Sequence, residues 1–246
     1  MKQTALTTIL TAFLALNASS VIAQTNIAST PSTQTAADQD TRTLDKHFKP
    51  IQKALALNDP AKEAKVRDIF GSHLKAFDAW HAQNDSQIKE LWNEFNHARS
   101  QQNETNADAA LAKIDAVYAT FKPEHDKFLA ALATALTPGQ IDTVKDALTI
   151  NKVKVTYDAY GQIFHGLTDA QKAFILKNLQ AAREEAIDAN AMAEKSAFFK
   201  KYKIKIEAYL TSQGYDVKQA YKDFVAKQKA EAAAKKAATP AKPDAE

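Results

Sequence analysis

The stretch that decides the fold begins Leu136-Thr137-Pro138-Gly139-Gln140-Ile141, and the same pattern recurs as Leu167-Thr168-Asp169-Ala170-Gln171. In each copy the threonine is a helix N-cap, and the glutamine three residues later completes a capping box. The two side chains then accept hydrogen bonds from backbone N–H groups that have no partner in the first turn. Proline is favoured at the first helical position, where its missing N–H costs nothing. Both copies therefore predict helix starts.

Two long helices follow the second capping box. Apolar residues at helical spacing predict the first through Ile187 and the second over about Glu194 to Ser212. Gly214 follows directly and can take the left-handed conformation that ends a helix. Between the two boxes, residues 150–157 carry β-branched side chains in near alternation. This pattern predicts one short extended segment.

Upstream, apolar residues recur at helical spacing in four further segments. We expect helices over Thr43 to Leu57, over Ala61 to His81, around Ile88 to Phe95 after a break at residues 84–86, and around Leu111 to Phe121. Residues 217–238 are expected to form a last, lysine- and alanine-rich helix. The chain has 5 glycines, 7 prolines and no cysteine, so burial without disulfides must hold it together. We predict an all-α fold, a multi-helix bundle of helical hairpins.

The two ends of the chain differ from its middle. A positive start, a short apolar run and small residues before Gln24 are typical of a signal peptide, residues 1–23, cut after Ala23. We therefore expect a secreted or periplasmic protein without a membrane span in the mature chain. Residues 24–41 read as a flexible linker, 42–225 as the helical domain and 226–246 as a Lys/Ala-rich tail.

Composition excludes several classes of function. The net charge of +3 is too weak to indicate nucleic acid as a partner. Thiolate zinc sites are impossible without cysteine, and the six histidines lack the spacing of paired metal ligands. There is no phosphate-binding loop, dinucleotide fingerprint or nucleophile elbow. We predict no metal and no cofactor, and nothing in the sequence specifies an oligomeric state.

One candidate site lies on the first long helix. Glu184 and Asp188 are four residues apart and share a face. Arg183 lies along the apolar line of the same helix, and a buried guanidinium needs a carboxylate partner. Two interpretations remain open, an internal ion pair that locks two helices together and a pocket for a hydroxylated or anionic ligand.

Aromatic residues supply the rest of the candidate site. Tyr157 and Tyr160 follow the segment expected to be extended, and Lys201, Tyr202 and Tyr209 lie on the second long helix. The alternative is that these tyrosines are core residues and the lysine is solvated, as on an ordinary amphipathic helix.

Two families share features with this chain. The paired capping boxes are similar to those of small all-helical periplasmic chaperones of the envelope-stress type. A longer series of motifs resembles an uncharacterised family of exported bacterial proteins, the domain of unknown function 3826. The matching segments are Asn58-Asp59-Pro60, Val66-Arg67-Asp68-Ile69, Val155-Thr156-Tyr157, Arg183-Glu184, Lys201-Tyr202-Lys203 and Gln213-Gly214-Tyr215-Asp216. Lys200 and Ile204 depart from it, because they stand where the family tends to have glycine.

That resemblance implies sugar binding, which is how the family is described. Our first hypothesis is non-catalytic binding of a small polar ligand such as a carbohydrate, with tyrosine faces against the sugar and charged side chains on its hydroxyls. The first alternative is a periplasmic interaction or chaperone-like protein, which requires a large exposed apolar surface. The second is a hydrolase that uses Glu184 and Asp188, although carboxylates on one helix face are poorly placed to flank a glycosidic bond.

Overall fold

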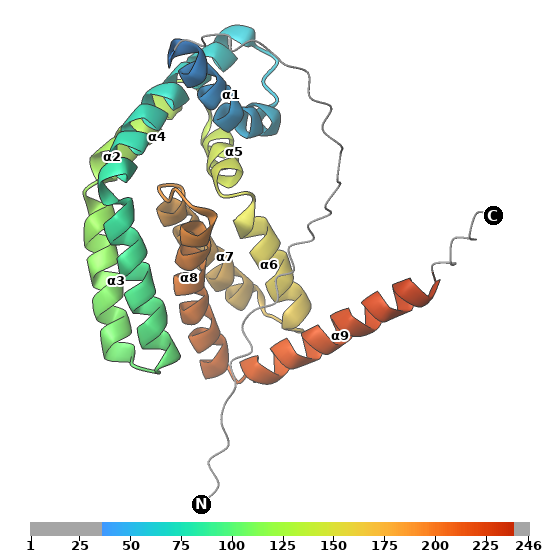
Figure 1. Cartoon of the computed structure of the whole chain (residues 1–246). Coiled ribbons are helices and arrows are strands. Elements are labelled where there is room, and N and C mark those ends of the chain that lie inside the picture. The colour runs from blue at the N-terminus through green and yellow to red at the C-terminus, as the bar shows by residue number, and fades with distance from the viewer. Residues whose placement is uncertain (1–35, 239–246) are drawn as a thin grey trace, which may run out of the picture.

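The protein folds as a set of packed α-helices. A computed structural model describes residues 36–238, and in that range there are nine helices and no strand (Figure 1). The helices are α1 (Ala36–Leu55), α2 (Pro60–Ser100), α3 (Glu104–Ala119), α4 (Lys122–Ala133), α5 (Pro138–Leu148), α6 (Lys152–Ile163), α7 (Asp169–Ala186), α8 (Met192–Ser212) and α9 (Val217–Ala238). The all-α class is thus confirmed. The predicted signal peptide and residues 24–35 of the predicted linker lie outside the described residues.

The prediction of an extended segment over residues 150–157 is wrong. Ile150 and Asn151 have φ of 55° and 52° and form a tight turn, after which α6 begins. Val153 and Tyr160 are buried in the core with Tyr157 packed against it, and these positions repeat with the period of a helix. Burial of this helical stripe outweighs the weak β preference of the branched residues, because that preference depends on context.

Two helix boundaries also differ from expectation. Residues 84–86 do not break the chain, and α2 is a single helix of 41 residues. The Asn84 amide is satisfied within the helix, where its Nδ2 donates to the carbonyl oxygen of Trp80 at 2.8 Å. The first helix begins at Ala36, seven residues before the expected Thr43 and inside the segment expected to be linker.

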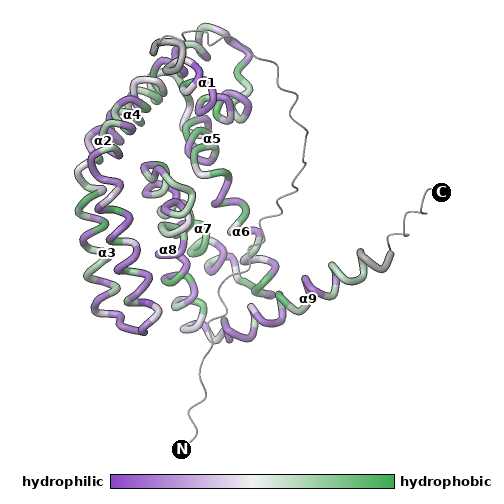
Figure 2. Tube along the Cα trace, viewed as in Figure 1, coloured by the Kyte–Doolittle hydropathy of each residue, from purple (hydrophilic) through white to green (hydrophobic). Residues whose placement is uncertain are grey.

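Two hydrophobic cores share α2. The upper core in Figure 1 is formed by α1, the first half of α2, α4 and α5. The lower core is formed by the second half of α2 with α3, α6, α7 and α8, and α2–α3 and α7–α8 are its two helical hairpins. Figure 2 shows apolar and hydrophilic residues interleaved along these helices, as expected for helices that bury one face.

The last helix leaves the body of the protein. Its beginning packs on α6 and α8, and Tyr221 Oη donates to Glu207 at 2.7 Å. Beyond this contact α9 points away from the other helices (Figure 1). None of the described helices has the length and apolar character needed to cross a membrane.

Both predicted capping boxes are present. Thr168 accepts from the Gln171 backbone N–H at 3.3 Å, and Gln171 Oε1 accepts from the Thr168 backbone N–H at 2.9 Å. The corresponding pair at the start of α5 is Thr137 and Gln140. Local chemistry therefore fixes where α5 and α7 begin.

We expect Thr168→Ala to lower the free energy of unfolding by about 1 kcal/mol, because it removes one half of the capping box of α7. Urea unfolding followed by circular dichroism measures the change. Thr168→Ser is the matched control, since a serine hydroxyl also caps, and it should retain most of the stability. Equal stability of the alanine variant and the wild-type protein would contradict a capping role.

Candidate functional site

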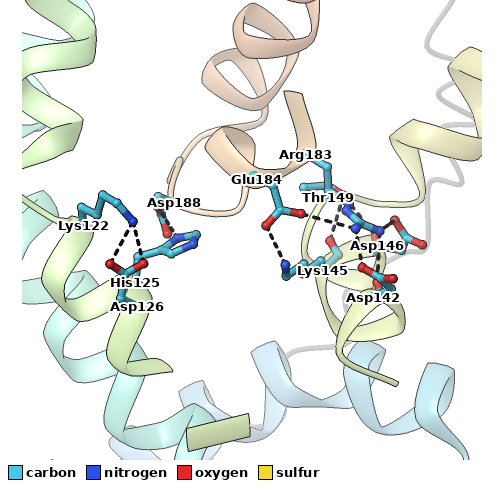
Figure 3. Close-up of polar contacts among 10 residues, drawn as sticks. All are labelled: Lys122, His125, Asp126, Asp142, Lys145, Asp146, Thr149, Arg183, Glu184 and Asp188. Carbon is cyan, nitrogen blue, oxygen red and sulfur yellow. Dashed lines mark hydrogen bonds and ion pairs between the residues drawn. The ribbon is translucent and has the colours of Figure 1, made fainter. Parts of the chain in front are cut away.

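A polar junction lies in the middle of the molecule, where the turn between α7 and α8 meets α2 and α4. Asp188 is the centre of this turn. His81 on α2 donates from Nε2 to the backbone carbonyl of Asp188 at 2.8 Å. His125 on α4 donates from Nδ1 to Asp188 Oδ2 at 2.8 Å (Figure 3). The turn is therefore held by imidazoles from two helices that are distant in sequence.

Beside this junction is an open cavity of about 270 Å³ that we call the acidic cleft. One wall comes from α3 and α4, and the other comes from α7, the α7–α8 turn and α8. Four carboxylates line it together with a tyrosine, a histidine and a lysine. These polar residues are Asp115, Tyr118, Lys122, His125, Glu184, Glu185 and Asp188.

Lys201 joins the two walls of the acidic cleft. Its Nζ donates to Asp115 at 2.7 Å and to Glu185 at 2.9 Å. Burial acts to lower the pKa of Lys201, but the hydrogen bonds to these two carboxylates raise it overall. Tyr202 Oη also donates to Glu185, at 2.6 Å. Lys201 and Tyr202 thus support the cleft by holding Glu185 in place.

Arg183 faces α5. Its guanidinium donates to Asp146 at 2.8 Å and to Asp142 at 2.5 Å, and it also contacts Glu184 at 3.3 Å (Figure 3). Glu184 in turn accepts from Lys145 Nζ at 2.6 Å. This network links α7 to α5. Arg183 therefore has the contacts expected of an internal ion pair between two helices. Glu184 extends from that network to the edge of the acidic cleft.

The electrostatics of the junction centre on the pair formed by Asp188 and His125. Burial raises the pKa of Asp188, against the opposing effect of the hydrogen bond from His125. The same hydrogen bond is the main cause that raises the pKa of His125. Asp188 Oδ1 is buried and has no hydrogen-bond partner among the described residues.

The tyrosines proposed from the sequence are elsewhere. Tyr157 and Tyr160 line a different cavity of about 570 Å³ between α6 and the start of α7. Tyr160 is buried and stacked on Phe164. Tyr209 stacks on Phe174 at a centroid distance of 4.0 Å. Of the residues predicted from the sequence, Glu184 and Asp188 line the acidic cleft, and Lys201 and Tyr202 contact its Glu185 without lining it. Arg183, Tyr157, Tyr160 and Tyr209 also lie outside the lining.

Sequence reasoning missed five polar residues of the cleft, which are Asp115, Tyr118, Lys122, His125 and Glu185. Asp115, Tyr118 and Glu185 are polar positions on ordinary amphipathic helices, and the sequence contains no signal that separates them from solvated ones. Pro123 did mark a helix boundary close to His125, and irregular backbone often carries binding residues. That boundary was the available signal for His125.

Metal binding has no support in the geometry of these side chains. In residues 36–238 no group of three or more histidine or carboxylate side chains is arranged to hold a metal ion. The acidic cleft presents carboxylate acceptors, a phenol, an imidazole and the ammonium of Lys122, which suit a polar organic ligand.

Fold and site together define an all-α protein with an acidic cleft between two helical hairpin layers. The chain belongs to the family described as "Protein of unknown function (DUF3826)", which matches residues 41–230. No curated protein shows significant sequence similarity to it.

Proposed function

We propose that this protein binds a single sugar ring, or a similarly small polyhydroxylated molecule, in the acidic cleft without transforming it. The observation that carries the proposal is Asp188, which lines the cleft and whose buried Oδ1 has no hydrogen-bond partner among the described residues. An unsatisfied buried acceptor is costly, and a ligand hydroxyl that donates to it would remove this cost.

The other cleft residues complement such a ligand. Carboxylates from opposite walls, Asp115 and Glu185, accept hydrogen bonds from hydroxyl groups. Phe198 and the ring of Tyr118, which meet edge to face at 4.9 Å, provide an apolar surface for the C–H face of a sugar. A few polar groups against an apolar wall is the usual composition of a ligand pocket.

The size of the acidic cleft points to a small ligand. Pockets that bind drug-sized ligands span about 300–1,000 Å³, and the cleft lies just below this range. A monosaccharide or one terminal residue of a chain fits this volume better than a polymer segment. Export through the signal peptide predicted over residues 1–23 would place the protein where such sugars are released.

The two alternatives receive less support. For hydrolysis, Glu184 and Asp188 both line the acidic cleft, but they belong to the same wall and cannot flank a glycosidic bond from opposite faces. Glu184 is also held by Lys145 and Arg183, and Asp188 by His125. For a chaperone-like role, the described residues include few strongly exposed large apolar side chains. They are Ile150, Val155, Met192 and Val225.

Titration calorimetry with a panel of neutral monosaccharides tests the proposal. We expect at least one of these sugars to bind. Asp188→Asn should weaken binding about tenfold or more, because a hydrogen bond to a charged group contributes about 1.5–3 kcal/mol. Asp115→Asn alters the opposite wall at a half-exposed residue, so it tests the same cleft with little risk to folding.

Glu90→Gln is the matched control, because Glu90 is an exposed carboxylate on α2 away from the cleft. It should bind the sugar as the wild-type protein does. Thermal unfolding of each variant separates loss of binding from loss of fold. The proposal is wrong if no monosaccharide binds, or if Asp188→Asn and Asp115→Asn both bind with wild-type affinity while folded.

A further inference from the structure

A second cavity lies on the other side of the turn that carries Asp188. It has a volume of about 240 Å³ and lies between α1, α2, α5 and the α7–α8 turn. Asp188 faces the acidic cleft, whereas its neighbours Ile187 and Ala189 line this second cavity. Most of the remaining wall is apolar. It includes Ile51, Phe70, Leu74, Phe77 and Leu148.

Lys195 places a positive charge in this apolar wall. Its Nζ donates to the carbonyl oxygens of Ala189 at 2.6 Å and Ala186 at 3.3 Å. An ammonium group has three N–H donors, so one remains after these two bonds. Within residues 36–238 Lys195 forms no ion pair with a carboxylate. The charge therefore has a free donor and lacks a hydrogen-bonded counter-ion.

Burial of this ammonium has a measurable consequence. It lowers the pKa of Lys195 to about 8, despite the opposing charges of Asp188 and Glu194. Lys195 is thus still mainly protonated at neutral pH, but its charge is poorly compensated. A bound anion would supply the missing partner.

A buried histidine adds a second unsatisfied group. His73 lines the same cavity, is 9% exposed and has no hydrogen-bond partner for Nδ1 among the described residues. Burial, together with the charge of His125, lowers the pKa of His73 to about 4, so its ring is neutral at pH 7. A neutral imidazole can donate to or accept from a ligand oxygen.

The other charges around the cavity leave a positive balance. Lys46 and His47 on α1 are exposed at its edge, opposite Asp78 on α2, which is also exposed. Among the lining residues, the ammonium groups of Lys46 and Lys195 outnumber the single carboxylate of Asp78, while Asp188 and Glu194 act on Lys195 from outside the lining. The free N–H donor of Lys195 therefore favours an anion at the polar end of the cavity.

We propose that this cavity binds a small carboxylic acid with an aromatic ring or a short hydrocarbon chain, its carboxylate on Lys195 and its apolar part against Phe70 and Phe77. The volume is sufficient. An apolar cavity of about 150 Å³ holds benzene in another protein, so about 240 Å³ accommodates a ring with one carboxylate. The site is separate from the acidic cleft and does not depend on its ligand.

Titration calorimetry with benzoate as the probe tests this site, with benzyl alcohol as the neutral analogue of similar size. We expect benzoate to bind at least tenfold more tightly than benzyl alcohol. Lys195→Met should weaken benzoate binding about tenfold or more and leave benzyl alcohol binding nearly unchanged. Leu74→Trp, which fills the cavity from α2, should abolish binding of both compounds.

Affinity for benzoate should also depend on pH. The carboxylate requires protonated Lys195, so the dissociation constant should be constant from about pH 6 to 7 and rise about tenfold per pH unit above about 8. Lys177→Met, which removes an exposed lysine of α7, is the matched control and should bind as the wild-type protein does.

The outcomes separate this proposal from sugar binding in the acidic cleft. Asp115→Asn should impair sugar binding and leave benzoate binding unchanged. If no binding is detected at about 10 mM benzoate, the proposal is overturned, because any remaining affinity is too weak for a specific carboxylate site. Equal affinities for benzoate and benzyl alcohol, or an unaffected Lys195→Met variant, would overturn the assignment of the carboxylate to Lys195.

Discussion

Phe121→Ala should lower the free energy of unfolding by about 3–5 kcal/mol, the usual cost of deleting a buried phenylalanine. Phe121 is 1% exposed and lies at the junction between α3 and α4. The centroid of its ring lies 6.1 Å from that of Phe77 and 5.2 Å from that of Trp80, both on α2. The residue fills the space between the α2–α3 hairpin and the first turn of α4, so the cavity left by alanine cannot easily collapse.

The same substitution should also disturb the acidic cleft. The backbone carbonyl of Phe121 accepts from the N–H of His125, one turn further along α4. A shift of this turn would move His125 relative to Asp188. We expect Phe121→Ala to weaken sugar binding as well as stability, which calorimetric titration of the folded variant below its unfolding midpoint would detect.

Phe121→Leu provides the comparison for this prediction. Leucine retains much of the apolar volume, so the loss of stability should be about 1.5 kcal/mol or less after repacking. Chemical unfolding of the two variants against the wild-type protein measures both effects. Similar costs for leucine and alanine would show that the apolar volume of Phe121 is not what stabilises the junction between α3 and α4.

Arg183→Met should lower the free energy of unfolding by about 2–3 kcal/mol. The guanidinium side chain is 6% exposed and holds Asp142, Asp146 and Glu184. Loss of one partner of a buried pair can cost about 3–5 kcal/mol. The three carboxylates are 34–55% exposed and would regain water, so the expected cost is smaller. Methionine keeps most of the volume, which isolates the loss of charge and hydrogen bonds.

Arg67→Met is the matched control for this prediction. Arg67 pairs with Asp45 at 2.6 Å, but its side chain is half-buried at 34% exposure and that of Asp45 is exposed at 58%. Exposed ion pairs contribute about 0–1 kcal/mol, so Arg67→Met should have a small effect. If urea unfolding shows equal losses for the two variants, the link between α5 and α7 through Arg183 is no stronger than a surface contact.

The elements predicted correctly from the sequence are those whose instructions are local. Thr137 with Gln140, and Thr168 with Gln171, satisfy each other within one turn, so their roles do not depend on the rest of the chain. Gly214 takes φ of 92° after α8, as its position predicted. The all-α class follows from helical periodicity summed over many segments.

Expectations failed where a local preference competed with packing. Val153 and Val155 favour a strand by residue type, yet α6 forms because Val153 and Tyr160 reach the core only at helical spacing. In α2, the polar residues near Asn84 resemble a break. Burial on both sides of that point, through His81 and Ile88, keeps the helix continuous.

The sequence by itself determined that this chain is helical, where several helices begin and end, and which residues could carry charge or hydrogen bonds. The tertiary structure alone decided the partners. Asp188 meets His125 across 63 positions and His81 across 107, and no local pattern encodes such a pairing. Periodicity specifies which face of a helix is buried but leaves open the helix it packs against. Whether a buried carboxylate faces a guanidinium, an imidazole or an open cleft therefore depends on how the hairpins pack.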